Sequence, residues 1–160
     1  MKRYIMSTSN IGIILYRDGS IDYMEVSPTG VFFTTDLAYL KNNEDMGDFG
    51  SAERAETYLL LPQAKVWNPA IEFKYYEPWG WGNIVCTVGD LEKFGIDDEC
   101  DWEIDEGYGV TSTDGLAWAG KQLGYDATLI SDVPRNHGWG ERFDEYAVYN
   151  PAVLRRLYEH

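Results

Sequence analysis

The sequence predicts an α+β domain in which short strands predominate and short helices lie between them. Short runs of β-branched and aromatic residues alternate with turn signals, a pattern that is typical of strands. The best supported helix covers residues 114–123, where apolar residues recur at core-facing spacings. With 160 residues, of which 44% are hydrophobic, the chain has the size of one domain, residues 1–160, that buries its own core.

The first part of the chain is predicted to be rich in strands. Residues 4–6 and 11–16 are two apolar runs separated by a polar turn, and each is expected to form a strand. Asp18-Gly19 favours a tight hairpin turn because these residue types accept positive φ, so residues 21–26 are predicted to be the returning strand. A Ser-Pro-Thr-Gly turn then leads to a strand over residues 31–35.

The middle of the chain is predicted to combine short helices with one interrupted strand. Asp36 is expected to cap a helix over residues 37–40. Residues 58–61 form a predicted buried strand that a proline interrupts, and residues 64–67 continue it. Residues 75–83 are dense in aromatic residues and Gly and are predicted to form a structured loop. A helical turn at residues 51–56 and a short helix from Asp90 complete this part of the prediction.

The last part of the chain is predicted to contain one helix, two strands and a long loop. The helix described above ends at Gly124, a residue type that favours a helix C-terminus, and residues 125–131 follow as a strand. Residues 132–142 hold Pro, Gly and Asn, so an irregular loop is expected there. Glu145 then lies at the start of an apolar, aromatic strand, and Asn150 is expected to cap a last helix that has Pro in its first turn.

The chain carries a large negative charge, with 27 acidic and 13 basic residues and a formal net charge of −14. Such a surface repels phosphate backbones and favours positively charged partners, so direct binding to nucleic acid is not expected. No apolar run approaches the roughly 18 residues of a membrane span, and polar residues interrupt the apolar region that a signal peptide needs. We therefore expect a cytoplasmic protein without a membrane partner.

Several classes of site are excluded by the residues that the chain lacks. No Gly-rich dinucleotide turn, P-loop or Gly-x-Ser-x-Gly elbow occurs. Only His137 and the last residue, His160, could supply histidine chemistry, and the two cysteines lack the spacing of a zinc or redox motif. Seven of the residues 97–106 are acidic, but Trp102 occupies the position where a calcium loop requires Gly. We expect a solvated loop there and no metal site.

The chemistry that remains centres on Glu145. A carboxylate on a rigid strand beside an apolar surface is well placed for catalysis, whereas the alternative is a strand-end carboxylate that faces water. Phe32 and Phe33 are expected on opposite faces of their strand, so one ring can serve the core while the other lines a cleft. Core packing is the alternative for these rings and for Tyr39.

Four segments share their residue pattern and their order with a known family. Residues 143–150, Phe-Asp-Glu-Tyr-Ala-Val-Tyr-Asn, match its last catalytic strand, and residues 30–39 match its second motif, a Gly-led aromatic strand before a helix with another aromatic residue. Residues 4–9 lie where its first motif has a short strand and a small-residue turn, and residues 124–127, Gly-Tyr-Asp-Ala, match the start of a further strand. The chain thus resembles the ADP-ribosyltransferase superfamily, in particular its small phage and toxin-type members.

The resemblance implies a fold and a set of site residues. The fold is a split β-sandwich, in which two small, mainly antiparallel sheets surround a cleft and short helices flank them. Glu145 would be the catalytic residue, and Phe32 and Tyr39 would hold the nicotinamide ring between them. The first motif would bind NAD through Met6, Ser7 and Thr8, and this chain has Met6 in place of the family's His and Phe32 in place of its central Tyr.

The implied activity is mono-ADP-ribosylation, in which NAD is the substrate and ADP-ribose is transferred to a protein. The acidity favours a basic or nucleic-acid-binding acceptor protein, and the resemblance to phage and toxin-type members favours an anti-defence effector that acts on host machinery in the host cytoplasm. The segment before Glu145 would recognise the acceptor. Arginine is disfavoured as the acceptor because Phe143 stands where arginine-modifying members have Glu or Gln.

Two alternatives differ from this activity in their chemistry. With water as the acceptor, the same site would hydrolyse NAD and release free ADP-ribose. The other alternative is a non-catalytic acidic binding protein on a degenerate scaffold of the same family, an inhibitor that occupies a nucleic-acid-binding surface. The replacements at Met6 and Phe32 favour this second alternative.

Overall fold

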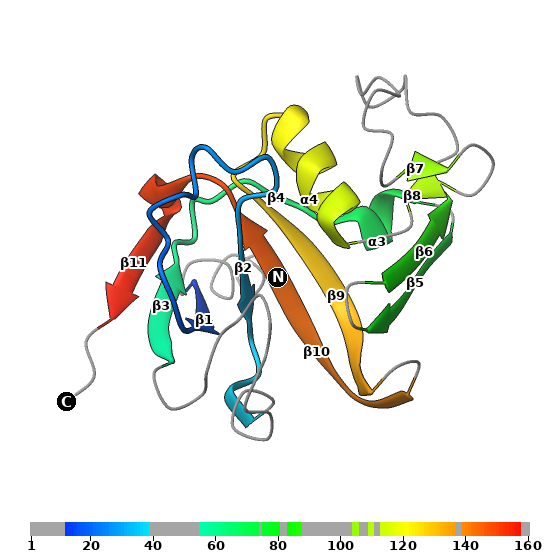
Figure 1. Cartoon of the computed structure of the whole chain (residues 1–160), viewed down its shortest axis with the longest axis horizontal. Helices are drawn as coiled ribbons and strands as arrows, with labels where there is room; N and C mark the ends of the chain where they lie inside the picture. Colours follow the sequence, from blue (N-terminus) through cyan, green and yellow to red (C-terminus); the bar gives the residue numbers. More distant parts are fainter. Residues whose placement is uncertain are drawn as a thin grey trace, which may run out of the picture.

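The computed structural model describes residues 12–38, 55–73, 75–80, 83–87, 104–105, 109–110, 113–136 and 139–157 (Figure 1). Its main element is a seven-stranded sheet with the strand order β11-β3-β1-β2-β10-β9-β4. Neighbouring strands of this sheet are antiparallel, except that β4 and β9 are parallel. Two two-stranded sheets, β5-β6 and β7-β8, accompany it in the described part of the chain. The expected α+β class, with strands predominating, is confirmed.

The described elements follow one another along the chain with few helices among them. Their bounds are β1 Ile13–Arg17, β2 Val31–Thr34, β3 Glu56–Leu60, β4 Val66–Trp67, α3 Pro69–Glu72, β5 Tyr75–Gly80, β6 Asn83–Thr87, β7 Ile104–Asp105, β8 Gly109–Val110, α4 Thr113–Gln122, β9 Ala127–Asn136, β10 Trp139–Val148, the 3₁₀ turn η4 Pro151–Val153 and β11 Leu154–Leu157. Within these residues, no helix is long and apolar enough to cross a membrane.

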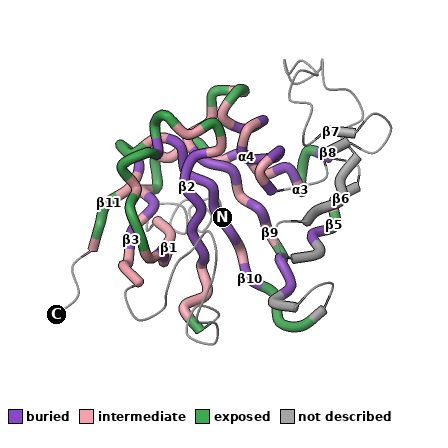
Figure 2. The backbone as a smooth tube through the Cα atoms, in the orientation of Figure 1, coloured by how far each residue is buried: buried purple, intermediate pink, exposed green. Residues whose placement is uncertain are grey.

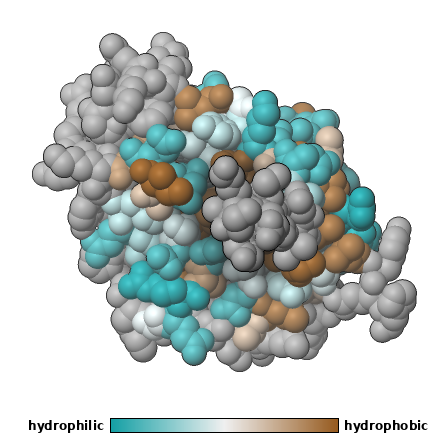
Figure 3. Space-filling view, turned by 180° about the vertical axis from the view of Figure 1, so that it is seen from behind, coloured by the Kyte–Doolittle hydropathy of each residue, from teal (hydrophilic) through white to brown (hydrophobic). Residues whose placement is uncertain are grey.

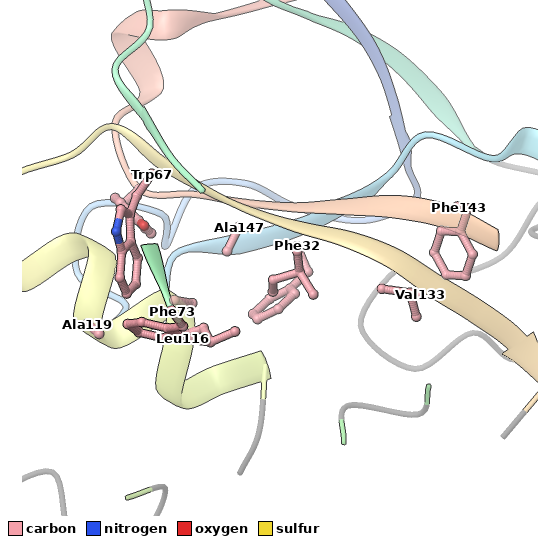
Figure 4. Close-up of a cluster of buried hydrophobic side chains, with 11 residues drawn as sticks. Phe32, Trp67, Phe73, Leu116, Ala119, Val133, Phe143 and Ala147 are labelled. Atoms are coloured by element: carbon pink, nitrogen blue, oxygen red, sulfur yellow. The ribbon is translucent and has the colours of Figure 1, made fainter. Parts of the chain in front are cut away.

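Each face of the seven-stranded sheet carries a buried cluster, and successive residues of a strand contribute to different clusters because they point to opposite faces. On one face, which we call the α4 face, the buried cluster is Phe32, Trp67, Phe73, Leu116, Ala117, Ala119, Ile130, Val133, Phe143, Ala147 and Tyr149. Figure 4 shows Phe32, Phe73 and Leu116 grouped between the sheet and the helices, with Val133 and Phe143 further along the β9-β10 hairpin. On the opposite face the buried cluster is Leu15, Met24, Val31, Phe33, Tyr58, Leu60, Ala127, Tyr146, Val148 and Val153.

Helix α4 approaches the sheet closely at Gly120. A Cβ atom at this position would collide with the hydroxyl oxygens of Thr128 and Tyr149, and would lie 3.1 Å from a ring carbon of Trp67. These two hydroxyl groups are hydrogen-bonded to each other, and Thr128 also donates to the carbonyl of Leu116 in the helix at 3.3 Å. The predicted helix is therefore confirmed, and glycine at its closest point allows the contact with β9. Gly124 follows the helix with φ of 88°, as expected for its C-terminal stop.

The Gly-Tyr-Asp-Ala segment before β9 has a structural role in this fold. The Asp126 carboxylate accepts the backbone N–H of Lys65 at 2.8 Å through Oδ2 and the amide of Asn150 at 3.0 Å through Oδ1. It therefore joins the chain before β4 to the chain after β10. Asn150 in turn accepts the N–H of Ala152 at 3.0 Å and caps η4.

Residues 21–26 form turns, and the strand predicted there is wrong. The N–H of Met24 donates to the carbonyl of Ile21 at 3.0 Å, and the N–H of Val26 donates to that of Tyr23 at 3.1 Å. Strand β1 already has β3 on one edge and β2 on the other, so a returning strand has no edge of β1 to pair with. The Asp18-Gly19 turn instead leads into a surface segment from which only Met24 is buried.

The two segments predicted as loops, residues 75–83 and 132–142, are also corrected. Most of the first belongs to β5, which pairs with β6 and has an irregularity after Pro78. The second extends β9 and β10 into a long hairpin, and two register shifts absorb its turn-forming residues. Asp132 at one shift has φ of 57°, and Gly140 at the other has φ of 100°. Local breaker residues therefore produce bulges rather than a loop, because the flanking strands pair across them.

The last predicted helix is shorter than expected. Only the 3₁₀ turn η4 forms, and the chain then returns as β11 to pair with β3. Several other predictions lie outside the described residues. They are the strand at residues 4–6, the helix from Asp90, most of the acidic stretch, and the helical turn at residues 51–56, of which only the last two residues are described.

Candidate functional site

Glu145 lies in the interior of β10, whereas the sequence suggested that it lies at the start of a strand. The strand begins at Trp139 because the hairpin with β9 continues far beyond Glu145. Glu145 pairs with Thr34 of β2 on one side and with Ile130 of β9 on the other. Its exposed fraction is only 6%, so the alternative of a strand-end carboxylate that faces water is wrong.

The side chain of Glu145 shares the α4 face with a row of hydroxyl-bearing residues. Directly paired residues of antiparallel strands point to the same face. Thr34 is paired with Glu145 and with Tyr16, and Tyr16 is paired with Thr57. We call Glu145, Thr34, Tyr16 and Thr57 the polar row. It crosses β10, β2, β1 and β3 at one level of the sheet.

Glu145 lies at the border between two differently covered parts of the α4 face. Along β10 its neighbours on this face are Phe143 and Ala147, which belong to the buried cluster. On the other side of the border, Tyr16 and Thr57 are only partly buried and Ile14 is 40% exposed. Figure 2 shows this contrast between the buried β2, β9 and β10 and the more accessible β1, β3 and β11. A carboxylate at such a border is desolvated and still close to accessible surface.

The strand that carries Glu145 is held firmly to the end of β2. Thr35 donates through its N–H and its hydroxyl to the carbonyl of Asp144, both at 3.0 Å, and its hydroxyl accepts the N–H of Asp144 at 3.1 Å. The Asp144 carboxylate accepts the N–H of Asp132 at 3.1 Å, within the bulge of β9. These bonds fix the residue before Glu145 to the end of β2 and to the bulge of β9, as a preorganised site requires.

Tyr146, the next residue, points to the opposite face and stays neutral at ordinary pH. Its burial, and secondly the charge of Asp144, raise the pKa of Tyr146 to about 12. It therefore contributes packing rather than acid–base chemistry.

The predicted aromatic residues have clear places where they are described. Phe32 is 6% exposed within the α4-face cluster, and Phe33 is fully buried on the opposite face, with its ring centroid 5.2 Å from that of Tyr58. Both rings serve the core in this conformation. Phe32 is paired with Ala147, which lies two residues after Glu145 on β10. Met6, Ser7, Thr8 and Tyr39 lie outside the described residues.

The predicted acceptor segment is placed only in part. Arg142 is exposed, and its guanidinium donates to the carbonyl of Asp132 at 2.9 Å. The side chains of Arg135, His137 and Trp139 are outside the described set. The segment belongs to the β9-β10 hairpin, and its β10 strand leads directly to Glu145.

Sequence reasoning missed one buried charge and the polar row. Arg17, at the end of β1, is buried and donates to the carbonyl of Phe32 at 2.7 Å and to the hydroxyl of Tyr23 at 3.2 Å. It therefore fixes the backbone of β2 next to Thr34. The sequence feature that could have indicated this role is an arginine at the end of an apolar run, just before Asp-Gly. The polar row depends on the register between strands, which no local sequence pattern indicates.

The arrangement can stabilise positive charge or accept protons and hydrogen bonds from a ligand. A carboxylate held on a strand in a partly desolvated site interacts strongly with charge that develops next to it. Among the described residues, no group of three or more His, Cys, Asp or Glu side chains could hold a metal ion. Comparison of the chain with family models, with curated proteins and with solved structures finds no match in any of the three.

Proposed function

We propose that the chain is a mono-ADP-ribosyltransferase that cleaves NAD and transfers ADP-ribose to a protein. One observation carries the proposal. The segments that resemble the second and the last motif of this family are far apart in the sequence, yet they form adjacent strands, β2 and β10. Their register places Glu145 opposite Thr34 and Ala147 opposite Phe32. A buried carboxylate beside the Gly-led aromatic strand is the arrangement that the proposed chemistry needs.

In the proposed reaction Glu145 stabilises the ribose as the bond to nicotinamide breaks. The electron pair of that C–N bond leaves with the nicotinamide ring, which thereby loses its positive charge. The ribose becomes oxocarbenium-like, and a carboxylate that accepts a hydrogen bond from a ribose hydroxyl stabilises this cation. A nucleophilic atom of the acceptor protein then bonds to the ribose carbon and gives up its proton. Phe32 and Tyr39 would hold the nicotinamide ring by stacking, and Met6, Ser7 and Thr8 would line the remainder of the NAD site.

The proposal includes the family's fold and its biological setting. The fold would be the split β-sandwich of ADP-ribosyltransferases, with the site in the cleft between its two parts. The acceptor would be a basic or nucleic-acid-binding protein, because the net charge of −14 attracts positively charged surfaces. The chain would act as a phage or toxin-type effector in the host cytoplasm.

The test is incubation of the purified chain with labelled NAD and a host lysate. We expect label on protein and release of nicotinamide, and a loss of activity of at least about 100-fold in Glu145→Gln, since a residue that stabilises transition-state charge contributes about that much. Glu141→Gln is the matched control, because Glu141 is an exposed carboxylate on the same strand, and it should retain activity. Equal activity of Glu145→Gln and the wild type would refute the role of Glu145. Free ADP-ribose without labelled protein would show NAD hydrolysis instead.

The burial of Phe32 favours a second candidate, the non-catalytic acidic binding protein on the same scaffold. In this conformation the Phe32 ring packs in the core, 6% exposed, where it offers little surface to a nicotinamide ring. This candidate requires that NAD leaves the melting temperature unchanged and that a basic partner binds with an affinity that falls steeply with salt.

A further inference from the structure

Tyr16 shares the level and the face of Glu145, although the two residues lie on different strands. It pairs with Thr34, which pairs with Glu145, so only β2 separates them. Neighbouring strands are about 4.8 Å apart, which places the backbones of Tyr16 and Glu145 about 10 Å apart. Both side chains stand on the α4 face, so a ligand that contacts the tyrosine hydroxyl and the carboxylate must span this distance across Thr34.

The environment of Tyr16 suits a residue that contacts a ligand. Its ring packs against the α4-face cluster, to which β2, β9 and β10 contribute Phe32, Ile130 and Ala147. The residue is only partly buried. The hydroxyl of Tyr58 donates to Glu56 at 2.9 Å and that of Tyr76 to the carbonyl of Ser131 at 2.9 Å, whereas the Tyr16 hydroxyl has no hydrogen-bond partner within the described residues. A tyrosine with a packed ring and a polar tip near accessible surface presents a donor at a fixed place.

We propose that Tyr16 is a second ligand-contacting residue of the Glu145 site, whose hydroxyl donates a hydrogen bond to an oxygen of a ribose-bearing ligand. The polar row then binds the ligand from two sides, with the carboxylate of Glu145 accepting from one ribose hydroxyl and Tyr16 donating to another oxygen of the same ligand. Thr34 separates the two groups, and its own hydroxyl accepts the N–H of Asp36 at 3.1 Å, which fixes its side chain. This inference rests on the proposed function, because the ligand is the NAD of that reaction.

The test compares Tyr16→Phe, which removes only the hydroxyl, with the wild type. One neutral hydrogen bond is worth about 1 kcal/mol, so we expect KM for NAD to rise about 5- to 10-fold while kcat changes less than twofold. Direct titration of the inactive Glu145→Gln variant with NAD, with and without Tyr16→Phe, should show the same loss in Kd. Tyr125→Phe is the matched control, since Tyr125 also packs against the α4-face cluster, stacked on Trp67 with ring centroids 6.2 Å apart. It should leave both constants unchanged.

The outcomes separate this inference from the proposed function. If the wild type cleaves NAD and Tyr16→Phe changes neither KM nor, in the Glu145→Gln variant, Kd, the role of Tyr16 is refuted and the proposed function stands. If Tyr16→Phe and Tyr125→Phe weaken NAD equally, the effect is one of packing and the role is likewise refuted. If the wild type neither binds nor cleaves NAD, both proposals fall.

Discussion

Gly120 lies where α4 comes close to Thr128 of β9. We predict that Gly120→Ala lowers the free energy of unfolding by about 1–3 kcal/mol, because the added methyl group overlaps the buried hydroxyl groups of Thr128 and Tyr149. This loss exceeds the gain of up to about 1 kcal/mol that alanine brings to a helix interior. Urea denaturation measures the change, with Gln122→Ala, at an exposed position of the same helix, as the control. A Gly120→Ala protein as stable as the wild type would show that the helix can move away from the sheet at no cost.

Single residues also show which parts of the site were predictable. The sequence indicates that Glu145 is on a strand, because the flanking residues have a strand-like pattern. Its burial and its partners Thr34 and Ile130 come from pairings between distant segments, which no local pattern encodes. Asp126 illustrates the same limit, since its carboxylate joins Lys65 to Asn150 and thus three separate parts of the chain.

At the scale of elements, the bulge in β9 beside Glu145 leads to a prediction about Asp132. Its φ of 57° lies in the left-handed region, which asparagine, aspartate and glycine tolerate and β-branched residues do not. We predict that Asp132→Gly changes the free energy of unfolding by less than about 0.5 kcal/mol, whereas Asp132→Val lowers it by about 1–2 kcal/mol. Chemical denaturation of the two variants measures the difference, and equal stability would mean that the bulge relaxes to another register. Because the bulge adjoins Glu145, the proposed function predicts that Asp132→Val also reduces turnover of NAD.

The elements that the sequence predicts correctly are those with strong local signals. The period of α4 and the strand at β2 each follow from neighbouring residues. The proline after β3 does end that strand, but the prediction that residues 64–67 continue it is wrong, because β4 pairs with β9 at the other edge of the sheet. The β9-β10 hairpin was missed because Pro134 and Gly140 are breakers by local rules. In the fold Pro134 is paired with Arg142, and Gly140 lies in a bulge, so long-range pairing overrides the local signal. The same competition explains why residues 21–26 form turns, since both edges of β1 are occupied.

At the scale of the whole molecule, the surface and the two-sided core have separate physical roles. Figure 3 shows hydrophilic residues over much of the described part of one face, with hydrophobic residues in separate groups among them. The net charge of −14 acts at long range, whereas it has little to do with the fold. Stability comes from the buried clusters on both faces of the sheet. Three tyrosines in these clusters make the free energy of unfolding depend on pH.

The buried tyrosines predict a loss of stability in alkaline solution. Burial raises the pKa of Tyr146 to about 12, burial and the hydrogen bond to Glu56 raise that of Tyr58 to about 12, and burial raises that of Tyr149. In the unfolded chain these hydroxyls release their protons near pH 10, so above that pH the unfolded state binds fewer protons than the folded state. Stability is therefore fully present below about pH 10 and is lost as the pH rises from there toward 12.

Replacing one of these tyrosines isolates its share of the loss. We predict that Tyr146→Phe weakens the decrease in the free energy of unfolding between about pH 9 and 11 by roughly 1 kcal/mol, because phenylalanine keeps the packed ring and removes the ionising group. Val153→Ala is the control, since Val153 belongs to the same buried cluster as Tyr146 and its replacement removes no ionising group, so the pH dependence should stay that of the wild type. Urea denaturation over this range measures both variants. If Tyr146→Phe and the wild type lose stability in parallel, then Tyr146 ionises alike in the folded and unfolded states and its burial is not maintained in alkaline solution.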